Sequence, residues 1–138
     1  MATLFAYGTL MFAPIWSQVV GEVYETAPAT LHGYVRRAVV GQHYPVVLPA
    51  NRQNCVEGIV YFGVSNDNLA VLDEFEGIYY RRTSERVELS DSSMIAAFVY
   101  VLKDGYRSIA ADHEWDPKQF IEFGMKPFLE QYSGFSSI

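Results

Sequence analysis

The sequence has few of the features that assign a chain to a class at once. Its single cysteine, Cys55, excludes an internal disulfide and supplies no thiolate pair for a metal. Lys and Arg (10) are outnumbered by Asp and Glu (16), and no basic cluster occurs. The net charge of -6 therefore argues against a nucleic-acid surface or an anionic membrane surface. The partners we expect are small molecules, and we interpret Cys55 as a buried small apolar residue rather than a nucleophile.

Long apolar runs, repeats and low-complexity segments are also missing. No run reaches the roughly 18 apolar residues that span a bilayer, and the N-terminus has no basic region before its apolar stretch. With 50% hydrophobic and 15% aromatic residues, 138 residues suffice for one well-cored domain. We therefore expect residues 1–138 to form a single domain, a monomeric cytoplasmic protein with no membrane partner.

Metal-ligand spacing and nucleophile motifs are lacking too. His32, His43 and His113 are too scattered for a zinc site, and no serine lies in a nucleophile-elbow pattern. We expect neither a metal nor an organic cofactor. The segment 113–115 is interpreted as a loop anchored by its tryptophan, with closure over a pocket as the alternative. Residues 36–37, both arginine, are interpreted as a solvated strand face.

The hydrophobic pattern predicts an α+β fold. Helices are expected at residues 14–20, from a cap at Ser65 or Asn68 to residue 76, and from residue 117 onward. The three helices and the strands do not alternate strictly, which favours a curled, mainly antiparallel or mixed sheet. Strands are predicted at residues 3–7, 31–40, 44–48, 56–64, 82–89 and 94–102.

The terminal helix has clear start signals. Asp116 is the expected cap and Pro117 the first helical residue, whereas Pro127 is expected to kink or split the helix. Helical spacing predicts a core stripe of Phe120, Ile121, Gly124, Met125, Phe128, Leu129 and Tyr132.

Glu76 lies at an unusual position in the short acidic helix. At about 100° per residue, it falls between Leu69 and Leu72 on the apolar stripe, whereas Glu74 points the opposite way. Gly77 is expected to end the helix in a left-handed turn, which leaves Glu76 at the negative end of the helix dipole. Desolvation and the dipole would both raise its pKa, as suits a general base near neutrality. The alternative is a helix-end glutamate that bends out to solvent.

A second chemical feature is Tyr7-Gly8-Thr9-Leu10, where the first strand ends. Since Gly8 has no Cβ, the turn can present consecutive main-chain N–H groups to a carboxylate or an oxyanion. An ordinary exit from a strand is the alternative for this turn.

These segments resemble the gamma-glutamylcyclotransferase-like superfamily, most nearly its plant avirulence-induced-gene branch and gamma-glutamylamine cyclotransferase. The resemblance rests on the order of LFAYGTLM, LHGYVRR, YPVVL, VEGIVYFGV, LDEFEGIYYRR and HEWDPKQF. It implies a small β-barrel flanked by about three helices, with the substrate in a cavity at its side. It also implies release of 5-oxoproline, as the α-amine of a γ-glutamyl group attacks its own γ-carbonyl.

Carried over by position, the resemblance implies Glu76 as the catalytic general acid and base and Tyr7, Gly8, Thr9 and Leu10 as the substrate loop. Tyr80 and Tyr100 are candidate substrate contacts, each with a structural role as the alternative. Arg82 is expected to pair with a carboxylate near the start of its strand. Thr9 replaces the serine of many members. The short chain favours a γ-glutamyl amine or γ-glutamyl amino acid over glutathione.

Two other functions remain open on the residues. One is a non-catalytic module that binds a small carboxylate or serves in a stress response. The other is different acyl chemistry on the same scaffold, such as removal of a γ-glutamyl protecting group. Glu76 favours an enzyme, because a carboxylate binder gains nothing from a buried negative group.

Overall fold

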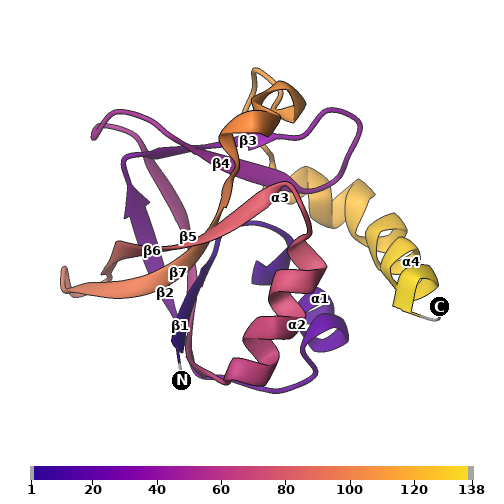
Figure 1. The fold of residues 1–138 in the computed structure, drawn as a ribbon, viewed down its shortest axis with the longest axis horizontal. Helices are drawn as coiled ribbons and strands as arrows, with labels where there is room; N and C mark the ends of the chain where they lie inside the picture. The colour runs from indigo at the N-terminus through magenta and orange to yellow at the C-terminus, as the bar shows by residue number, and fades with distance from the viewer. Residues whose placement is uncertain (1, 137–138) are drawn as a thin grey trace.

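Five strands close into a barrel in the computed structural model, which describes residues 2–136 and the side chains of residues 2–130. Neighbouring strands are antiparallel except for the parallel contact between the first and the last (Figure 1). The expected mixed, mainly antiparallel barrel is therefore confirmed. Its order is β1 (Ala2–Ala6), β5 (Cys55–Val64), β2 (Thr26–His32), β6 (Tyr80–Leu89) and β7 (Met94–Leu102).

A separate two-stranded sheet lies outside the barrel, formed by β3 (Tyr34–Ala38) and β4 (Pro45–Pro49). The predicted strand 31–40 is thus divided at Gly33, whose φ of 84° suits a turn. Residues 26–30 of β2 were not predicted. Pro28 pairs with β5, whereas β2 pairs with β6 only at Ala29 and Thr30. The N–H that Pro28 lacks therefore removes no hydrogen bond between β2 and β6.

Three helical regions flank the barrel, as expected. The first two, α1 (Ala13–Val19) and α2 (Asn66–Glu76), lie together on one side of it (Figure 1). The third is a run of α3 (Pro117–Gln119), a π-helical turn η3 (Phe120–Gly124) and α4 (Met125–Ser136). Two short 3-10 turns, η1 (Thr9–Met11) and η2 (Asp104–Ile109), complete the described elements. None of the helices in residues 2–136 combines the length and the apolarity needed to cross a bilayer.

The terminal run differs from its prediction in two respects. The helical run continues through Pro127, and its irregularity is the π turn that comes before Pro127. Because proline has no N–H, Pro127 cannot donate the usual helical hydrogen bond to the Phe123 carbonyl, and Phe123 lies in this π turn. The wider turn also changes which residues face the barrel. Phe120 is 3% exposed, but Ile121 is 55% exposed, so the prediction that Ile121 belongs to the core stripe was wrong. The side chain of Tyr132 lies outside the described residues.

Helix α2 is fixed at its first turn by the predicted cap. The Ser65 hydroxyl accepts a hydrogen bond from the Asn68 main-chain N–H at 3.2 Å, and the Tyr24 hydroxyl also contacts Ser65. Leu69 and Leu72 then bury one face of the helix against the core. The cap and the two leucines together set where the C-terminal end of α2 lies.

Replacing Ser65 by alanine removes this cap, and we expect a loss of about 1 kcal/mol in the free energy of unfolding. Urea denaturation measures the effect. Ser108→Ala, an exposed position in η2, is the matched control and should change stability by less than about 0.5 kcal/mol. Equal effects in both variants would contradict the role assigned to the cap.

Candidate active site

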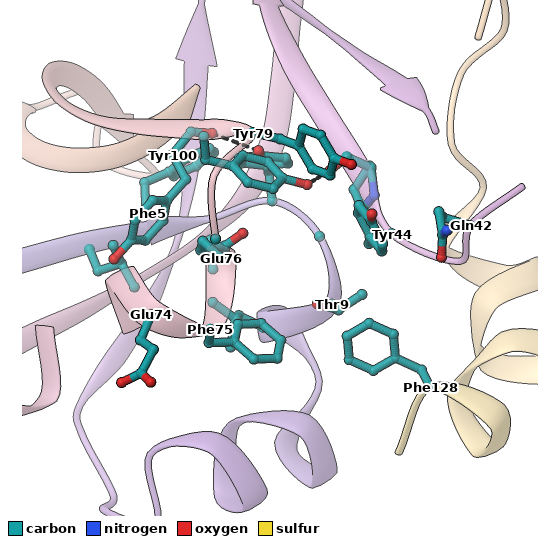
Figure 2. A pocket seen from close by; sticks show the side chains of 18 of the residues that line it. Phe5, Thr9, Gln42, Tyr44, Glu74, Phe75, Glu76, Tyr79, Tyr100 and Phe128 are labelled. Carbon is teal, nitrogen blue, oxygen red and sulfur yellow. Dashed lines mark hydrogen bonds between the residues drawn. The ribbon is translucent and has the colours of Figure 1, made fainter. Parts of the chain in front are cut away.

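A cavity of about 670 Å³ lies where the end of α2 meets the turn after β1 and the barrel strands β6 and β7 (Figure 2). This volume is ordinary for a small-molecule site. Every candidate site residue lines it, namely Glu76, Tyr7, Gly8, Thr9, Leu10, Tyr80 and Tyr100. The structure thus brings together two segments that are about half the chain apart. Phe75, Tyr44, Tyr79 and Phe128 add aromatic rings to the wall.

Glu76 is the acidic group of this wall. It is only partly exposed, and Figure 2 shows its side chain among the rings of the cavity, with that of Glu74 directed elsewhere. Burial, together with the smaller effect of the nearby Asp73 carboxylate, raises the pKa of Glu76 from 4.5 to about 8. The expectation of an inward, desolvated carboxyl at the end of the helix agrees with this geometry.

Gly77 turns the chain out of α2 in a way that differs in detail from the expectation. Its φ is 82°, as expected, but its ψ is -161°, which is an extended rather than a left-handed helical conformation. This region of backbone space is open almost only to glycine. A Cβ at Gly77 would meet nothing within 4 Å, so the backbone, not the available space, requires glycine here.

A hydrogen-bonded network lies one helical turn before Glu76. The guanidinium of Arg82 donates two hydrogen bonds to the Asp73 carboxylate, at 2.9 and 3.2 Å, and the Tyr100 hydroxyl donates a third at 2.7 Å. The predicted carboxylate partner of Arg82 is thereby confirmed. Asp73 was not predicted as part of the site, although its spacing of three residues from Glu76 places both on adjacent turns of one helix.

Tyr7 and Tyr80 line the cavity with their hydroxyls already bonded. The Tyr7 hydroxyl donates to the Tyr100 carbonyl at 2.6 Å, and the Tyr80 hydroxyl donates to the Pro45 carbonyl at 2.7 Å. Burial raises the pKa of both phenols well above 10.0, so both stay protonated. Their hydrogen bonds fix the cavity wall to β7 and β4.

The turn after β1 contributes main-chain donors and one hydroxyl. The first hydrogen bond of the 3-10 turn runs from the Met11 N–H to the Gly8 carbonyl. The N–H groups of the residues before Met11 therefore come before the first bond of this helical turn and are not used by it. A Cβ at Gly8 would lie 2.7 Å from Pro45, which explains the need for glycine at this point. Thr9 is also polar and buried, at 6% exposure. Both residues reach the cavity.

Two sequence interpretations are wrong. Arg36 is not on a solvated face, since its side chain is only 10% exposed and contacts Tyr7, Glu114 and Trp115. Sequence reasoning missed it because these contacts cross long stretches of chain. Cys55 is exposed, because it begins β5 directly after an exposed loop.

The segment 113–115 has the anchored form that was expected. Trp115 is 5% exposed and donates to the His43 carbonyl at 2.8 Å. Within residues 2–136, no three His, Cys, Asp or Glu side chains converge as a set that could hold a metal.

The barrel and its lateral cavity define a protein of the gamma-glutamyl cyclotransferase-like fold. A protein from Arabidopsis thaliana with a solution structure superposes with a TM-score of 0.72 at 26% identity, covering 95% of this chain and 87% of its own. The crystal structure of an AIG2-like protein from Mus musculus gives a TM-score of 0.63 at 25% identity, covering 84% and 88%.

The chain belongs to the family described as gamma-glutamyl cyclotransferase, AIG2-like, which matches residues 4–117. Among curated relatives, AIG2-like protein D of Arabidopsis thaliana is 33% identical over 140 residues, which is 99% of this chain and 90% of the relative. The resemblance noted in the sequence is therefore confirmed at the level of family and fold.

The raised pKa of Glu76 predicts a pH-dependent stability difference. Between pH 4.5 and about 8 the unfolded chain has this carboxyl ionised while the folded chain keeps the proton, so its contribution lowers stability as pH rises. Glu76→Gln removes that contribution. We expect its melting temperature to gain on the wild type progressively from about pH 5 to about pH 9, as measured by calorimetry. Glu74→Gln makes the same charge change at an exposed position of α2 and should show no such trend.

Asp73→Asn should lower the pKa of Glu76, because it removes the neighbouring negative charge and leaves Arg82 uncompensated. The ¹³C chemical shift of the Glu76 carboxyl, followed against pH by NMR, measures this directly. Asp67→Asn, in the first turn of the same helix, is the control. An unchanged or higher Glu76 pKa in Asp73→Asn would contradict the proposed electrostatic contact.

Proposed function

We propose that the protein is a gamma-glutamylcyclotransferase that acts on a γ-glutamyl amine or a γ-glutamyl amino acid and releases 5-oxoproline with the free amine. The observation that carries the proposal is Glu76, a carboxyl with a pKa of about 8 in a cavity shared with the turn Tyr7–Leu10. Membership of a family described as gamma-glutamyl cyclotransferase supports the reaction type.

Glu76 serves both proton transfers of the reaction. As a carboxylate it takes a proton from the substrate's α-ammonium, which frees the lone pair for attack on the γ-carbonyl carbon. A carbon–nitrogen bond forms to close the five-membered lactam, and the carbonyl electrons move to oxygen. Glu76 gives this proton to the leaving nitrogen as the tetrahedral intermediate collapses and the bond to the leaving amine breaks. The ring nitrogen still carries one excess proton after its attack; the regenerated Glu76 carboxylate takes this proton and passes it to the departing amine, which leaves as an ammonium ion. The lactam is then neutral and Glu76 is again a carboxylate. A pKa of about 8 lies near the operating pH, which suits both directions of transfer.

The aromatic wall of the cavity supplies the positioning that ring closure needs. Attack requires the amine and the carbonyl of one flexible chain to be held in near-attack geometry, and a fitted pocket provides this as effective concentration. In our proposal Tyr80 and Tyr100 contact the glutamyl portion through ring faces and edges, because the Tyr80 hydroxyl is bonded to Pro45 and the Tyr100 hydroxyl to Asp73.

The turn after β1 supplies the polar contacts. The amides of Gly8, Thr9 and Leu10 are suited to hold the substrate carboxylate or the developing oxyanion, and the buried Thr9 hydroxyl lies beside them. The proposed reaction requires no metal and no organic cofactor, because both proton transfers and the charge stabilisation are assigned to groups of the chain.

Glu76→Gln should abolish this chemistry while leaving the cavity intact. We expect 5-oxoproline formation to fall by at least about 100-fold, because general acid–base catalysis contributes about that much or more. Mass spectrometry of the products from a library of γ-glutamyl amines and γ-glutamyl amino acids is the measurement. Asp67→Asn, an exposed acidic position in the first turn of α2 that does not line the cavity, should retain wild-type turnover.

The same library separates the other functions. Retained turnover in Glu76→Gln would remove Glu76 from the mechanism. Release of free glutamate in place of 5-oxoproline would identify different acyl chemistry. Thermal stabilisation by 5-oxoproline without any product from the library would identify a binding module.

A further inference from the structure

The cavity has no positive charge of its own. Among the described residues that line it, the charged ones are Glu74 and Glu76, and none is Lys or Arg. An anionic ligand therefore needs positive potential from elsewhere, and main-chain N–H groups supply only partial charges. This requirement directs attention to the cation nearest the substrate loop.

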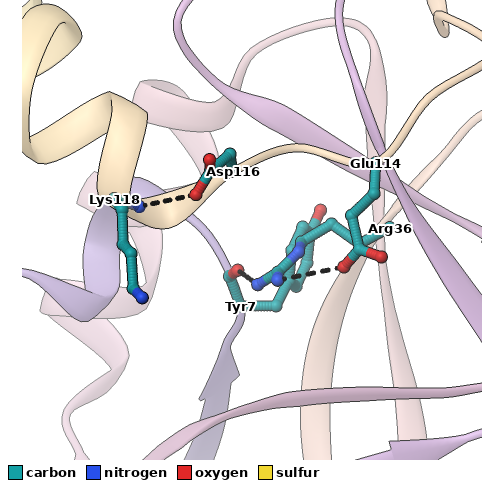
Figure 3. Close-up of polar contacts among 5 residues, drawn as sticks. All are labelled: Tyr7, Arg36, Glu114, Asp116 and Lys118. Atoms are coloured by element: carbon teal, nitrogen blue, oxygen red, sulfur yellow. Dashed lines mark hydrogen bonds and ion pairs between the residues drawn. The ribbon is translucent and has the colours of Figure 1, made fainter.

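Arg36 is that cation, and it contacts the loop from outside the cavity. Its Nη1 donates to the Tyr7 main-chain carbonyl at 2.8 Å, and its Nη2 lies 3.2 Å from a Glu114 carboxylate oxygen (Figure 3). The guanidinium also lies over the Trp115 ring, 5.3 Å from its centroid. Arg36 comes from β3, 29 residues away from Tyr7 in the chain.

The burial of Arg36 is not explained by saturated hydrogen bonding. The side chain is 10% exposed, and its Nε is buried without a partner among the described residues. Leaving a buried polar group unsatisfied costs free energy. A purely structural link between β3 and β1 does not need a charged group, so the position requires another account.

The geometry of the Tyr7–Gly8 peptide gives a reason for a buried charge at Arg36. The structure contains no cis peptide among its described residues, and in a trans peptide the C=O and the next N–H point in opposite directions. With the Tyr7 carbonyl held by Arg36, the Gly8 N–H is directed to the opposite side, where Gly8 lines the cavity. Among residues 2–136, no main-chain acceptor pairs with that N–H.

We propose that Arg36 is a positioning residue that holds and polarises the Tyr7–Gly8 peptide, so that the Gly8 N–H donates to an anionic oxygen of the ligand. A charged donor on the carbonyl strengthens the N–H at the other end of the same peptide. Pro45 packs against Gly8 Cα from β4 and limits movement of the peptide. The identity of the ligand rests on the proposed function, whereas the role of Arg36 in orienting the amide does not.

Titration of the ¹⁵N-labelled protein with 5-oxoproline tests the proposal without requiring turnover. In the wild type, the Gly8 amide proton should shift downfield as 5-oxoproline binds. In Arg36→Met the free-state Gly8 shift should move upfield, its response should fall by at least about half, and affinity should drop by about 10-fold. Arg36→Lys keeps the charge and should recover part of the response. It also carries the test if the methionine variant does not fold.

Glu114→Gln is the matched control, because it weakens the ion pair of Arg36 but leaves the bond to Tyr7 in place. Its Gly8 amide should respond as in the wild type. A wild-type Gly8 amide that ignores 5-oxoproline overturns the proposal, as does a folded Arg36→Met with an unchanged Gly8 shift and response. Arg36-dependent binding at Gly8 without turnover of any γ-glutamyl compound upholds it and rejects the cyclotransferase. Turnover of a γ-glutamyl compound, with a Gly8 amide signal that is the same in Arg36→Met as in the wild type, overturns the role of Arg36 and upholds the cyclotransferase.

Discussion

The structure depends on holding one carboxyl, that of Glu76, against the inner wall of a cavity. Desolvating such a group is unfavourable, so the surrounding chain must fix it firmly enough that it cannot turn out to water. The Ser65 cap, the buried Leu72 and the backbone conformation of Gly77 together fix the end of α2. A helix that was free to shift or fray would leave the carboxyl an ordinary exposed acid.

Barrel closure provides the other half of the site. The parallel contact of β1 with β7 joins the first strand to the last, which brings the turn after β1 beside Tyr100 and the beginning of β6. The bond from Tyr7 to the Tyr100 carbonyl then fixes these two strands at the cavity. Because the catalytic candidate is on α2 and the donors follow β1, only the closed barrel assembles a site in which one ligand can meet both.

Sequence alone predicted what local spacing encodes. The helical stripe that includes Glu76, the cap at Ser65 and the glycine after β1 are all legible within about ten residues. The order of strands and helices predicted the α+β class, whereas the closed barrel was implied only by the family resemblance. Arg36 was misinterpreted because its partners Tyr7 and Glu114 lie 29 and 78 residues away, and no local pattern records such contacts. Ile121 was misplaced because the π turn changes the angular step on which periodicity arguments rely.

The small sheet outside the barrel is attached to the cavity by two hydrogen bonds whose acceptors are both main-chain carbonyls, those of Tyr7 and Pro45. A carbonyl is present whatever side chain its residue carries, so the acceptor positions impose no choice of amino acid through these bonds. The choice falls entirely on the donors, Arg36 and Tyr80. As far as these two hydrogen bonds are concerned, relatives should vary less at the donor positions, Arg36 and Tyr80, than at the acceptor positions, Tyr7 and Pro45.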